Sequence, residues 1–356
     1  MGAQVSFNIK IDGKPVESAD VLGFTVERDM FQPDMAAIVL SNQESVYSAK
    51  YKIAAPIEVN VGDNDGKNIY KGEVVGFEAT FKGGEKARLL VRGMNKMHRL
   101  LRKRKSVTFM DKKDQEIISQ VANDAGLSLK WKHDVAIVYK HVYQHNLTDL
   151  EFIRMRAARL GAHVWCVDKD LYVQAPDLQS KPLATLKMGD TGTDAFRSFT
   201  PRLSSAAIVK QVTVKGWNPE TKELLTGVAS VEGSKLGKET SIAASFDFGK
   251  DETFTVDHPI WSNEEAKAIA KARLQDLSLS YITGECEVQG DARYDLGKVV
   301  QIVCNPEESK NDDPFNGNYY IMGVTHKYTV PRNKDGGYTS ILRLARDAQK
   351  PKESIS

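Results

Sequence analysis

Apolar and polar side chains alternate strictly over several short stretches at both ends of this chain. Near its start, Val5, Phe7, Ile9 and Ile11 follow the pattern. The same period of two returns at residues 24–26, 36–40, 57–61, 75–81 and 87–91, and then at 212–216, 286–288, 300–304, 320–328 and 341–343. A period of two places every second side chain on one face of a β-strand. We therefore predict two β-rich regions, each with one face of its strands packed on a core.

Between these regions the apolar period changes to that of an α-helix. Thr148 and Glu151 stand three residues apart as a capping box, and Gly161 stands where a left-handed residue would end the helix. The apolar face of this helix repeats at helical spacing through Leu150, Ile153, Ala157 and Leu160. Among the polar residues, we expect Asp149, Glu151, Arg154 and Arg156 to serve as helix-capping and surface charges.

A shorter helix is predicted before it, beginning around Asp111 and Asp114 and ending at Gly126. Its apolar stripe consists of Ile117, Ile118, Val121 and Ala125. After the second helix, residues 163–173 are predicted to form a hairpin. Together these elements form a small α+β unit at residues 96–195.

These patterns place the chain in the α+β class, with β structure dominant. We expect four segments: a first β-barrel module at residues 1–95, the α+β unit at 96–195, a second β-barrel module at 196–348, and a polar tail at 349–356. The second module carries one long helix, 262–279, which begins with a capping box from Ser262 to Glu265.

A weak internal repeat links the two β regions. Gly76 and Phe81 are separated by four residues, and so are Gly323 and Tyr328. Each segment then passes through a Gly-Gly turn into a strand that ends near an arginine. We interpret the repeat as two related modules in one chain, while unrelated hairpins can also look alike.

Composition excludes several classes of protein. Forty-nine Lys and Arg residues against forty-seven Asp and Glu give a net charge of +2, which argues against a dedicated nucleic-acid binder. The odd set of three cysteines, Cys166, Cys286 and Cys304, matches no zinc or disulfide pattern, so a reducing compartment is expected. Because no apolar run approaches eighteen residues, we predict neither a signal peptide nor a membrane span.

The search for catalytic chemistry is negative. The sequence contains no zincin, hydrolase-elbow, phosphate-loop or dinucleotide-binding motif, so we predict no catalytic residue, no cofactor and no metal ligand. His141 and His145 lie four residues apart on a predicted strand, but a metal there would need further ligands. The basic run at residues 99–105 has no interleaved aromatics, so a solvated face or a subunit salt-bridge surface is favoured over phosphate contact.

Four stretches together resemble one protein family. Residues 143–153 carry Asn146, Asp149 and Phe152 in the order of the core motif of the phage late control protein D family, and Gly161 follows at the family's spacing. The remaining agreement lies at residues 28–35, at 212–219 with Gly216, Trp217 and Pro219, and at 315–326 with Gly317, Tyr319 and His326. The same family includes the hub part of the type VI secretion valine-glycine repeat protein G and the hubs of extracellular contractile injection particles.

The resemblance implies a structural baseplate hub and no enzyme. It implies two modules similar to the tail-tube protein, so that a homotrimer presents six similar units to a six-subunit tube and threefold symmetry to a spike. The expected partners are the inner tube protein, a separate trimeric spike protein and other baseplate proteins. No nucleic-acid specificity is implied. The expected location is the cytoplasm during assembly and then a phage tail or contractile injection particle. Because the residues after 346 are few and polar, the needle is expected to be a separate protein.

Two other functions compete with the hub. A tail-associated cell-wall hydrolase would need paired carboxylates, for which Asp168 and Asp170 at the hairpin turn are the only candidates that stand out. A carbohydrate-binding β protein would need exposed aromatic platforms. Trp217, two residues before Pro219, is instead expected to pack in the core or against a turn.

Overall fold

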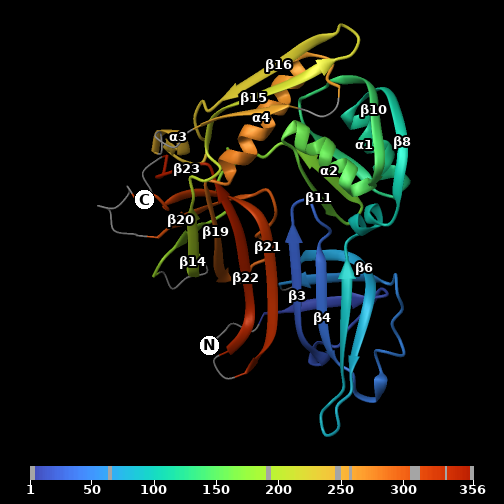
Figure 1. Cartoon of the computed structure of the whole chain (residues 1–356). Helices are drawn as coiled ribbons and strands as arrows, with labels where there is room; N and C mark the ends of the chain where they lie inside the picture. The colour runs from blue at the N-terminus through green and yellow to red at the C-terminus, as the bar shows by residue number, and fades with distance from the viewer. Residues whose placement is uncertain are drawn as a thin grey trace.

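The computed structural model describes residues 5–62, 66–189, 194–244, 250–255, 259–304, 313–332 and 335–352. Strands dominate, and the three longer helices lie together at one end of the molecule (Figure 1). The prediction of an α+β protein that is mainly β is therefore confirmed. Residues 1–4 of the predicted first module and residues 353–356 of the predicted tail lie outside the described part.

The first β region consists of seven strands around one apolar core. They are β1 (Phe7–Ile11), β2 (Lys14–Pro15), β3 (Val21–Asp29), β4 (Met35–Ser41), β5 (Pro56–Val61), β6 (Lys67–Thr80) and β7 (Arg88–Met94). Ile9, Ile38 and Val91 are buried, as the alternation predicts. Phe81, predicted to face the core, is instead 65% exposed, because the β6 segment runs past the edge of the core after Phe77.

The α+β region follows a short 3-10 helix, Lys96–Leu101. It contains β8 (Arg104–Lys113), α1 (Asp114–Asp124), β9 (Ser128–Lys132), β10 (Val138–Thr148), α2 (Asp149–Leu160), β11 (His163–Val167) and β12 (Asp170–Gln174). The capping box of α2 is confirmed: Thr148 Oγ1 accepts from the Glu151 amide at 3.2 Å, and Glu151 accepts from the Thr148 amide at 2.7 Å. The start of α1 near Asp111 was wrong, because β8 pairs with β10 up to Lys113.

The second β region consists of β13 (Thr185–Lys187), β14 (Phe196–Leu203), β19 (Ile282–Gln289), β20 (Val299–Val303), β21 (Gly317–Arg332) and β22 (Asp335–Arg346). Between β14 and β19 the chain forms an insert of β15 (Val209–Asn218), β16 (Glu223–Ser230), β17 (Glu239–Thr240), α3 (Ser241–Ala244), β18 (Lys250–Thr255) and α4 (Asn263–Leu279). The chain continues past Arg346 into β23 (Ala348–Gln349), which pairs with β17. Helix α4 packs on β15 and β16 through a separate apolar cluster.

The N-terminus of α4 matches only half of the predicted capping box. Ser262 Oγ accepts a hydrogen bond from the Glu265 amide at 3.1 Å, as predicted. The Glu265 carboxylate does not return to Ser262; it accepts from the Trp261 amide at 2.9 Å and pairs with Arg159 of α2. The reciprocal bond is therefore replaced by a link between two helices.

One sheet joins the two β regions. Its hydrogen-bonded order is β14-β19-β22-β21-β3-β4-β7-β6-β5-β1-β2, and β13 extends it through β20. The strand β21 runs antiparallel beside β3 at the centre of this order (Figure 1). The tip of the long β6–β7 hairpin lies at the end of the molecule away from α1, α2 and α4 (Figure 1).

Candidate functional site: the joint between the two β regions

The joint between the β regions is the pairing of β21 with β3. It runs from Gly323 opposite Asp29 to Thr329 opposite Gly23. Gly23 is required because a Cβ there would lie 2.8 Å from the carbonyl oxygen of Tyr328. The two β regions are thus held edge to edge by a backbone ladder, so each lacks a free edge at this place.

Aromatic and histidine side chains fill the inner face of the joint. The rings of Phe24 and Tyr328 stack across it with centroids 5.4 Å apart, and Phe7 of β1 packs against both. His326 is fully buried, with Nδ1 3.0 Å from Ser340 Oγ and 2.9 Å from the Tyr338 hydroxyl. Burial lowers the pKa of His326 to about 3. The histidine is therefore neutral here at ordinary pH.

Ion pairs, one of them buried, lie at one end of the joint. Arg28 of β3 lies 3.3 Å from Asp34 and 2.7 Å from Asp295, so it links its own hairpin to the turn before β20. Arg343 of β22 pairs with Asp29 at 2.6 Å. Burial raises the pKa of Asp34 to about 6, although Arg28 favours its charged form. Two ion pairs, Arg28–Asp295 and Asp29–Arg343, thus connect β3 with the second β region at this end of the joint.

The hairpins β6–β7 and β21–β22 share an unusual irregularity. The register shifts between Val74 and Gly76 in the first and between Ile321 and Gly323 in the second. After the shift, Gly76 lies opposite an arginine of β7, and Gly323 lies opposite Arg343 of β22. Both hairpins thus have a β-bulge at the same position relative to the repeated glycine.

The hydrogen bonds at the two bulges also correspond. The Val74 amide donates to Ala55 O at 2.9 Å, and the Val74 carbonyl accepts from the Ala54 amide at 2.8 Å. In the second hairpin, Ile321 donates to Lys298 O at 2.8 Å and accepts from Gly297 at 3.0 Å. The residues that donate to the bulges, Ala54 and Gly297, both have positive φ, 67° and 73°.

The strand neighbours of the two hairpins agree as well. In the first region the order is β3-β4-β7-β6-β5, and in the second it is β14-β19-β22-β21-β20. Each β strand of one series therefore has an equivalent in the other. The α+β region follows the first series in the chain, and the insert lies between β14 and β19 of the second, so neither interrupts the repeated strand order.

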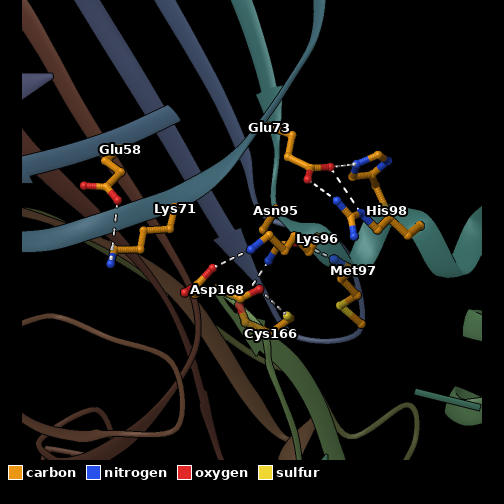
Figure 2. A network of polar contacts seen from close by, with 10 residues as sticks. Glu58, Lys71, Glu73, Asn95, Lys96, Met97, His98, Cys166 and Asp168 are labelled. Atoms are coloured by element: carbon orange, nitrogen blue, oxygen red, sulfur yellow. Dashed lines mark hydrogen bonds and ion pairs between the residues drawn. The ribbon is translucent and has the colours of Figure 1, made fainter. Parts of the chain in front are cut away.

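A polar network fastens the α+β region to the first β region (Figure 2). Asn95 donates to the carbonyl of Cys166 at 3.0 Å, and Lys96 pairs with Asp168 at 2.9 Å. Nearby, Glu73 of β6 lies beside His98 of the 3-10 helix (Figure 2). Glu73 also accepts a hydrogen bond from Arg99 of the same helix. Burial disfavours the charged carboxylate, but these hydrogen bonds lower the pKa of Glu73 below its usual value.

The motif residues of the α+β region have structural places. Asn146 has a φ of 47° and lies in a bulge of β10. Asp149 is buried and lies 2.7 Å from Lys105 and 3.1 Å from Gln144. Phe152 is fully buried and stacks on a ring of β8 at 5.7 Å. These contacts hold the start of α2 against the β8–β10 pair.

Gly161 and Gly126 both end a helix, but they differ in how closely other atoms approach them. Both follow a helix with positive φ, 66° and 76°, but a Cβ at Gly161 would lie 3.1 Å from Cα of Ala272 in α4, whereas at Gly126 it would meet only the end of Arg99 at 3.6 Å. Gly161→Ala should therefore destabilise the protein by about 2–3 kcal/mol, and Gly126→Ala by about 1 kcal/mol. Urea unfolding of both variants measures the difference; equal losses would contradict close packing at Gly161.

The motif of β15 gives one correction. Gly216 is buried and Pro219 is exposed at the end of the hairpin. Trp217, predicted to pack in the core or a turn, is 53% exposed. The prediction was wrong because the side chains of β15 alternate: Val212 and Val214 pack with α4, and Trp217 lies on the opposite, exposed face.

The motif at the start of β21 is buried around one arginine. Gly317 has a φ of 132°, and its missing Cβ leaves room for the Arg346 guanidinium. Tyr319 is fully buried, donates to Phe315 O at 2.8 Å, and lies under Arg346 at 5.1 Å. Arg346 also donates to three backbone carbonyls, so this motif anchors the last strand.

Two charges expected on the surface of α2 are buried. Asp149 is one, and Arg156 is the other; Arg156 pairs with Asp114 of α1 and lies 4.3 Å from the Tyr139 ring. Sequence reasoning also missed Arg159, which pairs with Glu265 of α4. Helical spacing could not separate these arginines from solvent-facing ones, because their partners lie in other elements.

The two carboxylates considered above as catalytic candidates form ion pairs with lysines. Asp168 pairs with Lys96 and Asp170 with Lys130 at 3.4 Å, so each carboxylate is held by a lysine. His141 and His145 lie exposed on one face of β10. In the described residues, no three His, Cys, Asp or Glu side chains gather as a metal site. Cations of the basic run at 99–105 contact acids of the same chain.

Residues 2–329 match the sequence family described as Alg8 N-terminal domain. The chain belongs to this family. No curated protein is a match for the sequence. Among described residues, no helix has the length and apolarity that crossing a bilayer requires.

Solved structures show the same fold as this family member. A tail protein from Neisseria meningitidis MC58 aligns with a TM-score of 0.72 and 15% identity over 97% of both chains. The 43 kDa tail protein of prophage MuSo2 from Shewanella oneidensis aligns with 0.70 and 13% identity, over 96% of this chain and 98% of its own. An Escherichia coli type VI secretion component, described as similar to T4 tail proteins gp27 and gp5, aligns with 0.62 and 13% identity over 98% and 79%. The predicted resemblance to hub and tail proteins is confirmed in the fold.

Proposed function

We propose that this protein is a structural baseplate hub of a contractile tail or injection system and makes or breaks no covalent bond. The observation that carries the proposal is the duplicated β hairpin with its repeated strand order, joined edge to edge by β21 and β3. The fold shared with phage tail proteins and a type VI secretion component supports it. In this proposal residues 1–95 and 196–348 are the two tube-like modules, and 96–195 is the domain outside them.

The hub acts as a homotrimer with six similar modules. A ring of six modules made from three chains has two kinds of contact between modules, one within a chain and one between chains. The β21–β3 ladder is the contact within a chain. Three chains then present near-sixfold symmetry to the inner tube protein and threefold symmetry to a separate trimeric spike. Assembly with these and other baseplate proteins takes place in the cytoplasm, and the hub becomes part of the particle.

Light scattering of the purified chain tests the trimer. The expected particle is about 120 kDa, three times the 39.5 kDa chain. The measurement is made on the chain alone and in the presence of a trimeric spike protein, since a spike that binds the threefold state stabilises it by mass action. A monomer at micromolar concentration under both conditions contradicts the proposed function.

A further inference from the structure

We infer that the free half of β6 in one copy of this chain pairs with β14 of the next copy, in a register that places Glu78 opposite Arg202. The pairing repeats, between copies, the joint that β21 and β3 form within one chain. This inference rests on the proposed trimer and names the surface that holds it together.

The strand β6 occupies in the first region the place of β21 in the second. Beyond Gly323, one side of β21 pairs with β22 and the other side with β3. Beyond Gly76, one side of β6 pairs with β7, while its pairing with β5 stops at Glu73. In the described part of the chain no strand covers the other side of residues 76–80. This edge of β6 is therefore open where the equivalent edge of β21 is covered.

The ladder of the first region fixes which residue of β3 belongs to the repeat. Gly76 lies opposite Arg92 of β7. Arg92 lies opposite Ala37 of β4, and Ala37 lies opposite Thr25 of β3. Counting from the bulge glycine, Thr25 is thus three strands away across the sheet.

The ladder of the second region leads to a matching sequence in β14. Arg343, opposite the second bulge glycine, lies opposite Glu285 of β19, and Glu285 lies opposite Thr200 of β14. Thr200 follows Phe199, just as Thr25 follows Phe24. Strand β14 is therefore the equivalent of β3, and within the described residues it pairs only with β19.

The internal joint contains a stacked aromatic pair, and the equivalent aromatic residues lie at the two open edges. Tyr328 and Phe24 lie opposite each other in the internal joint, and Phe24 is only 2% exposed. Their equivalents are Phe81 beyond β6 and Phe199 of β14. Phe81 is 65% exposed. A stacked pair between copies would bury this ring in the way that the internal pair is buried.

The charges at the open edges are complementary. In the internal joint Thr325 lies opposite Glu27. The equivalent residues are Glu78, which also pairs with Arg92 of β7 at 2.8 Å, and Arg202; both are exposed. Opposite charges directly across an antiparallel pair favour pairing.

The backbone groups of β14 point the required way. Across the internal joint, the Met30 amide donates to Met322 O at 3.3 Å. The backbone N–H and C=O groups of the even-numbered residues of β3 therefore point toward β21. The Ser204 amide donates to Tyr281 O at 2.9 Å. The backbone N–H and C=O groups of even-numbered residues of β14 therefore point toward β19, and those of odd-numbered residues point toward the open edge. These odd residues are the equivalents of the even residues of β3. Pro201 supplies no N–H, so the ladder between copies has one donor fewer.

Each copy offers one open β6 half and one open β14 edge, which makes the contact head-to-tail. Such contacts either close into a ring or grow without end. Because the contact between copies repeats the joint inside each copy, the modules follow one another by similar rotations around a common axis. Three copies close a ring of six modules when that rotation is one sixth of a turn.

Disulfide trapping tests this register. A chain carrying Glu78→Cys and Arg202→Cys is oxidised, and covalent dimers and trimers are counted on a non-reducing gel. The two positions form a non-hydrogen-bonded antiparallel pair, with Cα atoms about 4.5 Å apart and within disulfide range. The native thiols compete little, since burial raises the pKa of Cys166, Cys286 and Cys304 to about 12.

The matched control pairs Glu78→Cys with Thr200→Cys, which keeps both thiols on one face but shifts the register by two residues. We expect at least tenfold less crosslinked product from the control. A particle that light scattering shows to be trimeric, with no excess of the Glu78–Arg202 product, overturns this inference and leaves the proposed function standing. An unmodified chain that stays monomeric with and without the spike overturns the proposed function itself.

Discussion

Replacing Glu265 by alanine is expected to lower the free energy of unfolding by about 3–5 kcal/mol, because it leaves a buried arginine without its partner. Glu265 is 1% exposed and pairs with Arg159, which is itself 8% exposed. Burial raises the pKa of Glu265, although Arg159 opposes that shift, and burial lowers the pKa of Arg159. The carboxylate also accepts the Trp261 amide at 2.9 Å. One substitution therefore removes an ion pair and a hydrogen bond to the backbone before α4 together.

Urea unfolding of Glu265→Ala measures this loss, and Glu264→Ala is its matched control. Glu264 occupies the same first turn of α4 but is exposed, so its removal should shift the unfolding midpoint much less. The double variant Glu265→Ala with Arg159→Met should recover part of the loss, since it removes the stranded charge. Equal midpoints for the two single variants would show that the α2–α4 pair does not stabilise the fold.

Local signals predicted the helices well, and long-range pairs escaped prediction. The capping box of Thr148 and Glu151 lies within four residues, so the sequence alone contains both partners. Arg156 and Asp114 are 42 residues apart, and Arg159 and Glu265 are 106 apart. Their pairing depends on how the elements pack, which no spacing in the sequence records.

The strands of the sheet show the same division. Buried strands such as β4 and β5 alternate clearly because one face is covered. Strand β14 was not predicted, since it lies at the end of the sheet, is mostly exposed and contains Pro201. Strand β8 escaped for a similar reason, because nearly all of its side chains are at least partly exposed.

The candidate joint was only partly visible in the sequence. The repeated glycines at 76 and 323 were found by their spacing, and both lie at bulges. The residues that bond to those bulges, Ala54 and Gly297, have no common sequence signal, because their role depends on backbone conformation. The equivalence of Phe24 and Phe199 likewise emerges only when the ladders are followed across the sheet.

The stability of the protein is expected to fall as the pH is lowered from about 6.5, and buried histidines are the reason. Burial lowers the pKa of His326 to about 3 and that of His163 to about 4, against an ordinary value of 6.5. Between these values the unfolded chain binds a proton that the folded chain does not, so acid favours unfolding. Each such histidine contributes about 1.4 kcal/mol per pH unit in this window.

His326→Gln removes one of these titrating groups from the inner face of the joint. The free energy of unfolding of this variant should fall less steeply than that of the unchanged chain, by about 1.4 kcal/mol per pH unit between pH 6 and 4. Asp34, whose pKa burial raises to about 6, acts in the opposite direction, but its effect is common to both proteins and cancels in the difference. Urea titrations at several pH values give the two slopes. Parallel slopes would mean that His326 gains its proton equally in the folded and unfolded chains, against its burial beside Tyr338 and Ser340.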